Sequence, residues 1–183
     1  MRAKIPLLAL LLPLALSAAP ASAQPPAQPT ERPRPRYMAA MEAELEAMQL
    51  SAACEAETAT RAHCAFRHRG RTTEREFQIH LVYSDDTDTI YVYVARYLLA
   101  PPDAASTPQL MRRLMELNWL LLLGKFEWDG NRGEVRVAMI INTDSNFDRR
   151  AFRSVVRNIG AVADRYHGEL NRIIAAEDPG DGE

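Results

Sequence analysis

The stretch ELNWLLLLGKFEWDGNRGEVRVAMI, residues 116–140, holds four consecutive leucines, Leu120 to Leu123. Three structures could account for it: a membrane segment, an active-site strand, or a helix that runs into a hairpin. A membrane-spanning helix needs about 20 apolar residues, so the leucine run is too short for one. Charged residues also flank the run, at Glu116 and Lys125. We therefore interpret the leucines as a last helical turn plus a connector, packed in a core between helix and sheet.

The second half of this stretch has the pattern of a β-hairpin. Phe126 and Trp128 alternate with charged residues, the sequence DGNRG at 129–133 supplies turn residues, and EVRVAMIIN at 134–142 reads as the return strand. Gly124 is placed to end the preceding helix as a left-handed cap, because glycine adopts that conformation without strain.

The preceding helix is predicted to start at Thr107. Thr107 can act as its N-cap, and Pro108 fits the first helical position, where a missing N–H costs nothing. Asn118 falls within reach of the inner face, where a buried amide must find hydrogen-bond partners. It could contact a ligand, but an internal hydrogen bond to a neighbouring chain end is the expected role. The inner face is expected to consist of Leu110, Met111, Leu114, Leu117 and Leu121.

Two further helices are predicted from apolar residues spaced three and four apart. Residues 148–176 form the longest helix, with Asp148 as its N-cap and Phe147 and Phe152 as a hydrophobic staple. Residues 37–50 form the first helix, whose methionine-rich stripe could line a binding groove, although a place in the core is the expected role. That stripe consists of Tyr37, Met38, Met41, Leu45 and Met48.

Residues 52–98 change to a period of two, which is typical of strands. A turn at 85–88 separates two of these strands, and its three aspartates lack the spacing and the distal Glu of a calcium-binding EF-hand loop. We expect a meander of three or four antiparallel strands here. The complete order is then helix, three or four strands, helix, two strands, helix, which is an α+β fold with an antiparallel sheet flanked by helices.

The two ends of the chain predict export and a single domain. Residues 1–23 have the basic start, the apolar run and the Ala-Ser-Ala site of a cleavable signal peptide. Residues 24–36 are a proline-rich linker and residues 177–183 an acidic tail, and we expect both to be disordered. The domain between them spans residues 37–176. We expect the protein to reside in the bacterial periplasm, with no membrane span after cleavage.

Cys54 and Cys64 are the two cysteines of the chain. They fit the two strands of a short hairpin whose turn lies at 58–61, and an oxidising compartment favours a disulfide between them. A metal site with His63 and His68 is an alternative, but neither a CxxC pair nor an HExxH helix is present. Free thiols are the third alternative.

Composition and motifs narrow the classes of function. The formal net charge is −2, which argues against nucleic acid as a partner. The chain contains no GxSxG elbow, Walker loop or zincin motif. We therefore predict that the protein is not an enzyme, and we assign it no catalytic residue, cofactor or metal site.

A row of arginines is the candidate partner-binding site. Arg149, Arg153 and Arg157 recur every four residues on the side of the last helix opposite its apolar stripe. Guanidinium groups bind carboxylates through paired hydrogen bonds, so the row could hold an acidic partner. A solvated helix face is the alternative interpretation.

The element order and the sequence at 114–142 together resemble the YbjN family of bacterial sensory transduction regulators. The matching features are Leu117-Asn118, Gly124-Lys125-Phe126, Asp129 and Gly133 around the hairpin turn, and a long helix that ends near RYHGEL at 165–170. The resemblance covers about residues 37–176. It implies a fold like that of type III secretion chaperones, used for protein binding and often dimeric, without established catalytic residues. The signal peptide and the cysteines distinguish this chain from cytoplasmic members.

The expected function is that of an exported, non-enzymatic YbjN-like domain that binds proteins in a chaperone-like or regulatory role. Its partner would be another protein or a second copy of the chain. The alternative is a small-ligand or envelope-stress sensor, which would show one large apolar pocket lined by Tyr91, Tyr93 or Trp128. A hydrolase without a recognisable motif is the least favoured class.

Overall fold

The computed structural model describes residues 33–144 and 146–176. The predicted signal peptide, residues 24–32 of the predicted linker and the acidic tail lie outside the described residues. The last linker residues, 33–36, are described and touch the domain. Arg34 pairs with Glu42 at 2.8 Å, and the backbone N–H of Arg36 donates to Asp85 at 3.1 Å.

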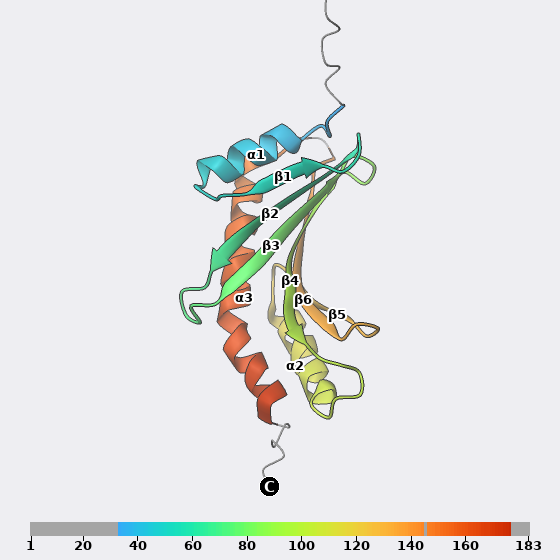
Figure 1. Ribbon diagram of the computed structural model, residues 1–183, viewed down its shortest axis with the longest axis vertical. Helices are drawn as coiled ribbons and strands as arrows, with labels where there is room; N and C mark the ends of the chain where they lie inside the picture. The colour runs from blue at the N-terminus through green and yellow to red at the C-terminus, as the bar shows by residue number, and fades with distance from the viewer. Residues whose placement is uncertain (1–32, 145, 177–183) are drawn as a thin grey trace, which may run out of the picture. The chain divides into compact units, whose positions relative to one another are not determined.

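Three helices and six strands make up the domain (Figure 1). The strands form one antiparallel sheet in the order β1-β2-β3-β4-β6-β5. The predicted α+β class and element order are confirmed, with four strands rather than three before the second helix. The elements are α1 (Met38–Ala47), β1 (Ala53–Ala56), β2 (Arg61–Arg69), β3 (Glu76–Ser84), β4 (Thr89–Leu99), α2 (Thr107–Leu120), β5 (Lys125–Asp129), β6 (Glu134–Asn142) and α3 (Arg149–Ala176).

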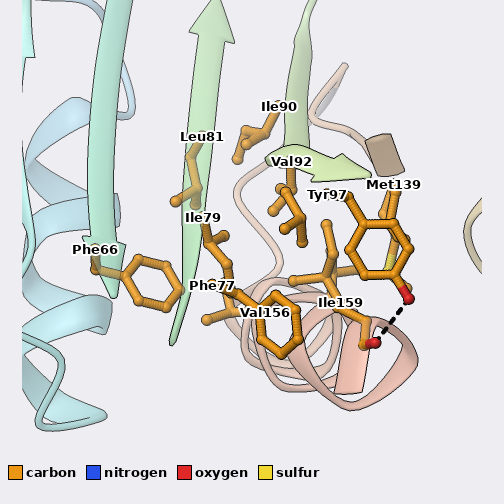
Figure 2. Close-up of a cluster of buried hydrophobic side chains, with 14 of the residues drawn as sticks. Phe66, Phe77, Ile79, Leu81, Ile90, Val92, Tyr97, Met139, Val156 and Ile159 are labelled. Atoms are coloured by element: carbon orange, nitrogen blue, oxygen red, sulfur yellow. Dashed lines mark hydrogen bonds between the residues drawn. The ribbon is translucent and has the colours of Figure 1, made fainter. Parts of the chain in front are cut away.

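The core lies between one face of the sheet and the helices. Alternate residues of each strand point into it, as the period-two pattern predicts. The phenol O–H of Tyr97 donates to the backbone carbonyl of Ala163 at 2.8 Å and so ties β4 to α3 (Figure 2). From β3 the core receives Phe77, Ile79, Leu81 and Tyr83; from α2, Leu110, Leu114 and Leu117; from α1, Met38, Met41 and Leu45.

The beginning of α3 confirms its predicted local signals. One carboxylate oxygen of Asp148 accepts hydrogen bonds from the backbone N–H groups of Arg150, at 2.8 Å, and Ala151, at 3.0 Å. The rings of Phe147 and Phe152 lie 5.1 Å apart. Asp148 therefore acts as the N-cap, and the two phenylalanines form the staple.

The ends of α2 differ from the prediction at two positions. Ser106 takes the N-cap position, and the hydroxyl of Thr107 donates to the carbonyl of Pro101 at 2.6 Å instead of capping the helix. At the other end α2 stops at Leu120, so Gly124 does not cap it. Gly124 does have a left-handed φ of 85°, but it lies at the entry to β5.

The predicted burial of the four leucines is wrong for three of them. Leu121 is partly buried and continues the inner face of α2. Leu120, Leu122 and Leu123 are 65 %, 99 % and 54 % exposed. The helix ends within the run and the connector turns outward, so these side chains face solvent instead of the core.

Asn118 explains why the connector turns at this point. Its side-chain oxygen accepts from the backbone N–H of Phe126 at 2.7 Å, and its amide nitrogen donates to the carbonyl of the same residue at 3.1 Å. The predicted internal hydrogen bond is therefore confirmed. Because β5 is an edge strand, Asn118 satisfies two backbone groups that would otherwise face outward.

Replacing Asn118 by alanine is expected to lower the free energy of unfolding by about 1–2 kcal/mol, because both backbone groups of Phe126 lose their partners. Urea denaturation measures this loss. Asn158→Ala is the matched control. Its amide donates to the nearby Ser154 on the same helix, so the change should alter the stability by less than about 0.5 kcal/mol. Equal losses in the two variants would contradict the role given to Asn118.

Candidate protein-binding surfaces

The largest exposed apolar side chains gather at the end of α2 and in the connector that follows it. Trp119 is 90 % exposed and Leu122 is 99 % exposed. Five residues within nine positions of the chain form this surface, which we name the α2 patch. They are Met115, Trp119, Leu120, Leu122 and Leu123.

The local structure of the α2 patch follows from its two boundaries. Leu117 and Leu114 are buried on the inner side of α2, which leaves Met115 and Trp119, four residues apart, on the outer side. After Leu120 the backbone becomes extended at Leu121, with ψ at 120°. Large exposed apolar patches are uncommon on monomeric soluble proteins and mark interaction sites.

The predicted arginine row is partly occupied by an internal partner. Glu44 of α1 is buried, and its carboxylate lies 3.5 Å from the guanidinium of Arg149 and accepts a hydrogen bond from Arg153. These two arginines therefore fasten α1 to α3. Arg157 lines two surface hollows, one of which it shares with Arg149 and Arg153. Binding of a partner by this row stays a prediction.

A second group of side chains crosses the face of the sheet that is opposite to the core. Nε2 of His63 and Nδ1 of His80 lie 2.8 Å apart and share a hydrogen bond. The His80 ring stacks on Tyr93 with 5.1 Å between ring centres, and Tyr93 lies 5.2 Å from Tyr91. The guanidinium of Arg136 lies 5.4 Å from the centre of each tyrosine ring. We name these residues the cross-strand row.

Glu127 of β5 binds two members of the cross-strand row. Glu127 accepts hydrogen bonds from the hydroxyl of Tyr91 and, at 2.9 Å, from Arg136. Burial raises the pKa of Tyr91, and the bond to Glu127 raises it further. Burial also lowers the pKa of His80, and the neighbouring His63 acts in the same direction. Hydrogen bonds, ring stacking and the pair between Glu127 and Arg136 therefore hold the row together across the sheet.

The surface beside Tyr93 differs from the apolar pocket that a small-ligand sensor would show. A hollow of about 580 Å³ lies there, and most of its lining is charged or polar. Trp128 has a separate role, because its indole N–H donates to the carbonyl of Ala100 at 3.0 Å. The charged lining residues are Arg75, Glu76, Arg96, Arg132, Glu134 and Arg136.

The two cysteines are joined by a disulfide. They face each other in the register of β1 and β2, in the short hairpin that their spacing predicts. Their sulfur atoms are therefore not metal ligands. Among the described residues, Glu55, Glu57 and His63 bring possible metal-ligand atoms within 4.8 Å of one another on the surface.

A family model matches residues 39–172, from α1 to near the end of α3. The chain belongs to the YbjN family. The family carries the description "Putative bacterial sensory transduction regulator". A search of curated proteins gave no match. In the part of this YbjN domain that the structure describes, no helix has both the length and the apolar character needed to cross a membrane.

Sequence reasoning identified the arginines of this YbjN domain but missed the α2 patch and the cross-strand row. The patch has a sequence signal, since Met115 and Trp119 fall outside the inner stripe of the predicted helix. The row has a weaker one, because His80, Tyr91 and Tyr93 each alternate with the apolar residues of their strands. Only the strand register brings these three side chains together.

Proposed function

We propose that this YbjN domain is an exported, non-enzymatic module that binds proteins in the bacterial periplasm, in a chaperone-like or regulatory role. The α2 patch is the observation that carries the proposal, because its apolar side chains need a partner to leave water. The signal-peptide pattern at 1–23 supports export, and the disulfide suits an oxidising compartment. The charged hollow beside Tyr93 does not favour the alternative of a small-ligand sensor.

We propose a second copy of the chain as the partner at the α2 patch. Two-fold contacts bring the same surface of both copies together, so a suitable helix face must be self-complementary. Arg112 and Trp119 lie two turns apart on the exposed side of α2, on either side of Met115. When two such helices pack antiparallel across Met115, Arg112 of one copy lies beside Trp119 of the other, which permits a cation–π contact.

Sedimentation velocity over a range of concentrations tests this assignment. The wild-type protein is expected to form dimers, and the double variant Trp119→Ser, Leu122→Ser is expected to weaken association at least about tenfold, since two buried apolar side chains are lost. Ile140→Ser is the matched control, because Ile140 is 54 % exposed and lies in β6, outside the patch. A wild-type protein that stays monomeric, or a double variant that dimerises as well as Ile140→Ser, would contradict a two-fold contact at this patch.

A further inference from the structure

The two edges of the sheet differ. At one of them the short edge strand β1 covers only part of its neighbour β2. β1 has four residues and β2 has nine. Their register begins at the pair Ala53 and Ala65, so residues 66–69 of β2 extend past β1 (Figure 1). The chain before β1 does not continue the pairing, and its residues Leu50 and Ser51 line a hollow beside Phe66 instead.

The hydrogen-bonding pattern shows which groups the uncovered half presents. In antiparallel pairs, successive residues point their backbone groups alternately to one neighbour and then to the other. The N–H of Gly70 donates to the carbonyl of Arg75 at 2.8 Å, which directs even-numbered residues of β2 toward β3. The N–H of Glu57 donates to Arg61 at 2.9 Å, which directs odd-numbered residues toward β1. The N–H and C=O groups of Arg67 and Arg69 therefore point outward, and the described chain places no strand against them.

Two hollows border this open edge, one toward each face of the sheet. A cleft of about 800 Å³ lies on the helix side, between the end of β2 and α3. A smaller hollow of about 470 Å³ lies beside Ala65, Phe66 and Arg67. A strand added at this edge would send alternate side chains toward the two hollows. The apolar part of the larger cleft comes from Met48, Leu50, Phe66, Val156 and Ala161.

The charge around the larger cleft is strongly positive in a chain whose net charge is −2. Among the described residues, its lining holds one carboxylate, that of Asp164, which already accepts hydrogen bonds from Thr72 and Thr73. Asp164 thereby holds the β2–β3 loop, which carries Arg71, against α3. The basic lining consists of Arg69, Arg71, Arg157 and Arg165, with His68 between β2 and α3.

The nearby glutamates do not neutralise this surface. Glu76 lies 3.7 Å from Arg67 and Glu74 lies 3.4 Å from Arg69, and all four side chains are more than 60 % exposed. Exposed ion pairs of this kind contribute little and exchange readily with other partners. The opposite edge of the sheet is different, because Asn118 satisfies the outward backbone groups of Phe126 in β5.

We propose that the open half of β2 binds an extended, acidic segment of a partner protein, which adds to the sheet as a short strand in line with β1. This site deepens the proposed protein-binding function, on which it rests, and lies on a different edge from the α2 patch. The backbone groups of Arg67 and Arg69 supply hydrogen bonds to the added strand. The apolar floor of the cleft receives its inward side chains, and the arginines select carboxylates.

Fluorescence anisotropy with a labelled peptide tests the site. The probe is an acetylated heptapeptide of alternating glutamate and valine, and its control has lysine in place of every glutamate. We expect the acidic peptide to bind at least about tenfold more tightly, because five arginines border the edge. The same acidic sequence with N-methylated glutamates lacks the backbone donors that face β2 when the valines enter the cleft, and it is expected to lose binding as well. Equal binding of all three peptides would overturn the proposal.

Variants of β2 separate backbone pairing from charge. Arg67→Pro removes an outward N–H without removing a bond to β3, and proline is tolerated on edge strands. Arg67→Pro should lower the affinity for the acidic peptide at least about fivefold more than Arg67→Ala, which removes the side chain only. If Arg67→Pro does not fold, the N-methylated peptide still decides whether backbone pairing is needed.

The source of the ligand and the proposed dimer are tested separately. Displacement of the peptide by phosphatidylglycerol vesicles would show that the arginines bind a membrane surface, and would overturn the assignment to a protein segment. The variant Trp119→Ser, Leu122→Ser is expected to keep peptide binding unchanged. If the wild-type protein does not bind the acidic peptide, the β2 site is rejected. The sedimentation result for the α2 patch is independent of that outcome.

Discussion

Replacing Asp164 by alanine is expected to lower the free energy of unfolding by about 3 kcal/mol, since charged acceptors contribute more than neutral ones. Asp164 is only 6 % exposed. It accepts from the N–H of Thr72 at 2.8 Å, from the N–H of Thr73 at 2.9 Å and from the hydroxyl of Thr73 at 2.7 Å. The variant leaves these donors without their acceptor and releases the β2–β3 loop from α3. Urea denaturation at neutral pH measures the loss.

The same carboxylate gives the stability a defined pH dependence. Burial acts to raise the pKa of Asp164, but the hydrogen bonds from Thr72 and Thr73 outweigh it and hold the pKa well below its usual range. A lowered folded-state pKa stabilises the protein above the unfolded-state pKa of about 3.9, and this contribution is lost as the pH falls further. The advantage of the wild type over Asp164→Asn should therefore be constant near pH 7 and shrink below about pH 4.

Asp103→Ala is the control for both measurements. Asp103 is an exposed aspartate for which the structure shows no hydrogen bond or ion pair among the described residues. Its replacement should change the stability by less than about 0.5 kcal/mol at neutral pH. If Asp164→Ala is no more destabilising than Asp103→Ala, the loop is not held by the carboxylate.

Removing the disulfide with the double variant Cys54→Ser, Cys64→Ser is expected to cost about 3 kcal/mol and to lower the melting temperature by roughly 10 °C. The bond closes a loop between residues ten positions apart and so restricts the unfolded chain. It also fixes β1, which has only four residues and pairs with a single neighbour. Thermal melting followed by circular dichroism measures the effect.

A reductant provides the internal control for this prediction. It should lower the melting temperature of the wild type toward that of the double variant and leave the double variant unchanged. Identical melting of the two proteins without reductant would mean that the bond adds no stability. A labelled thiol in the non-reduced wild type would mean that the bond is absent.

Much of the fold could be predicted because local patterns and tertiary packing agree. Phe77, Ile79, Leu81 and Tyr83 alternate in the sequence and all enter the core. Asp148 carries a cap signal next to a long apolar stripe, and the structure uses both. Where several local signals favour the same element, the sequence alone is informative.

The leucine run shows where this agreement fails. Apolar character predicts burial on average, but it does not say where a helix ends or which way the following chain turns. Here the hydrogen bonds between Asn118 and Phe126 fix the turn and direct Leu122 and Leu123 outward. The predicted cap at Thr107 is wrong for a similar reason, because the Thr107 hydroxyl donates to the carbonyl of Pro101 instead of capping the helix.

The candidate sites depended on contacts between distant parts of the chain. The arginine row was visible as a four-residue repeat, but its pairing with Glu44 joins α1 and α3 across more than 100 residues. The open edge of β2 follows from the different lengths and the register of β1 and β2. No local pattern encodes such a register.

The exposure of Trp119 also makes intrinsic tryptophan fluorescence a probe of the end of α2. The chain has two tryptophans, and Trp128 is less exposed and hydrogen-bonded through its indole N–H. Indole emission shifts to the blue when water is removed from around the ring, so covering Trp119 changes the intrinsic fluorescence. Occupancy of the end of α2 can therefore be followed in real time without any attached dye.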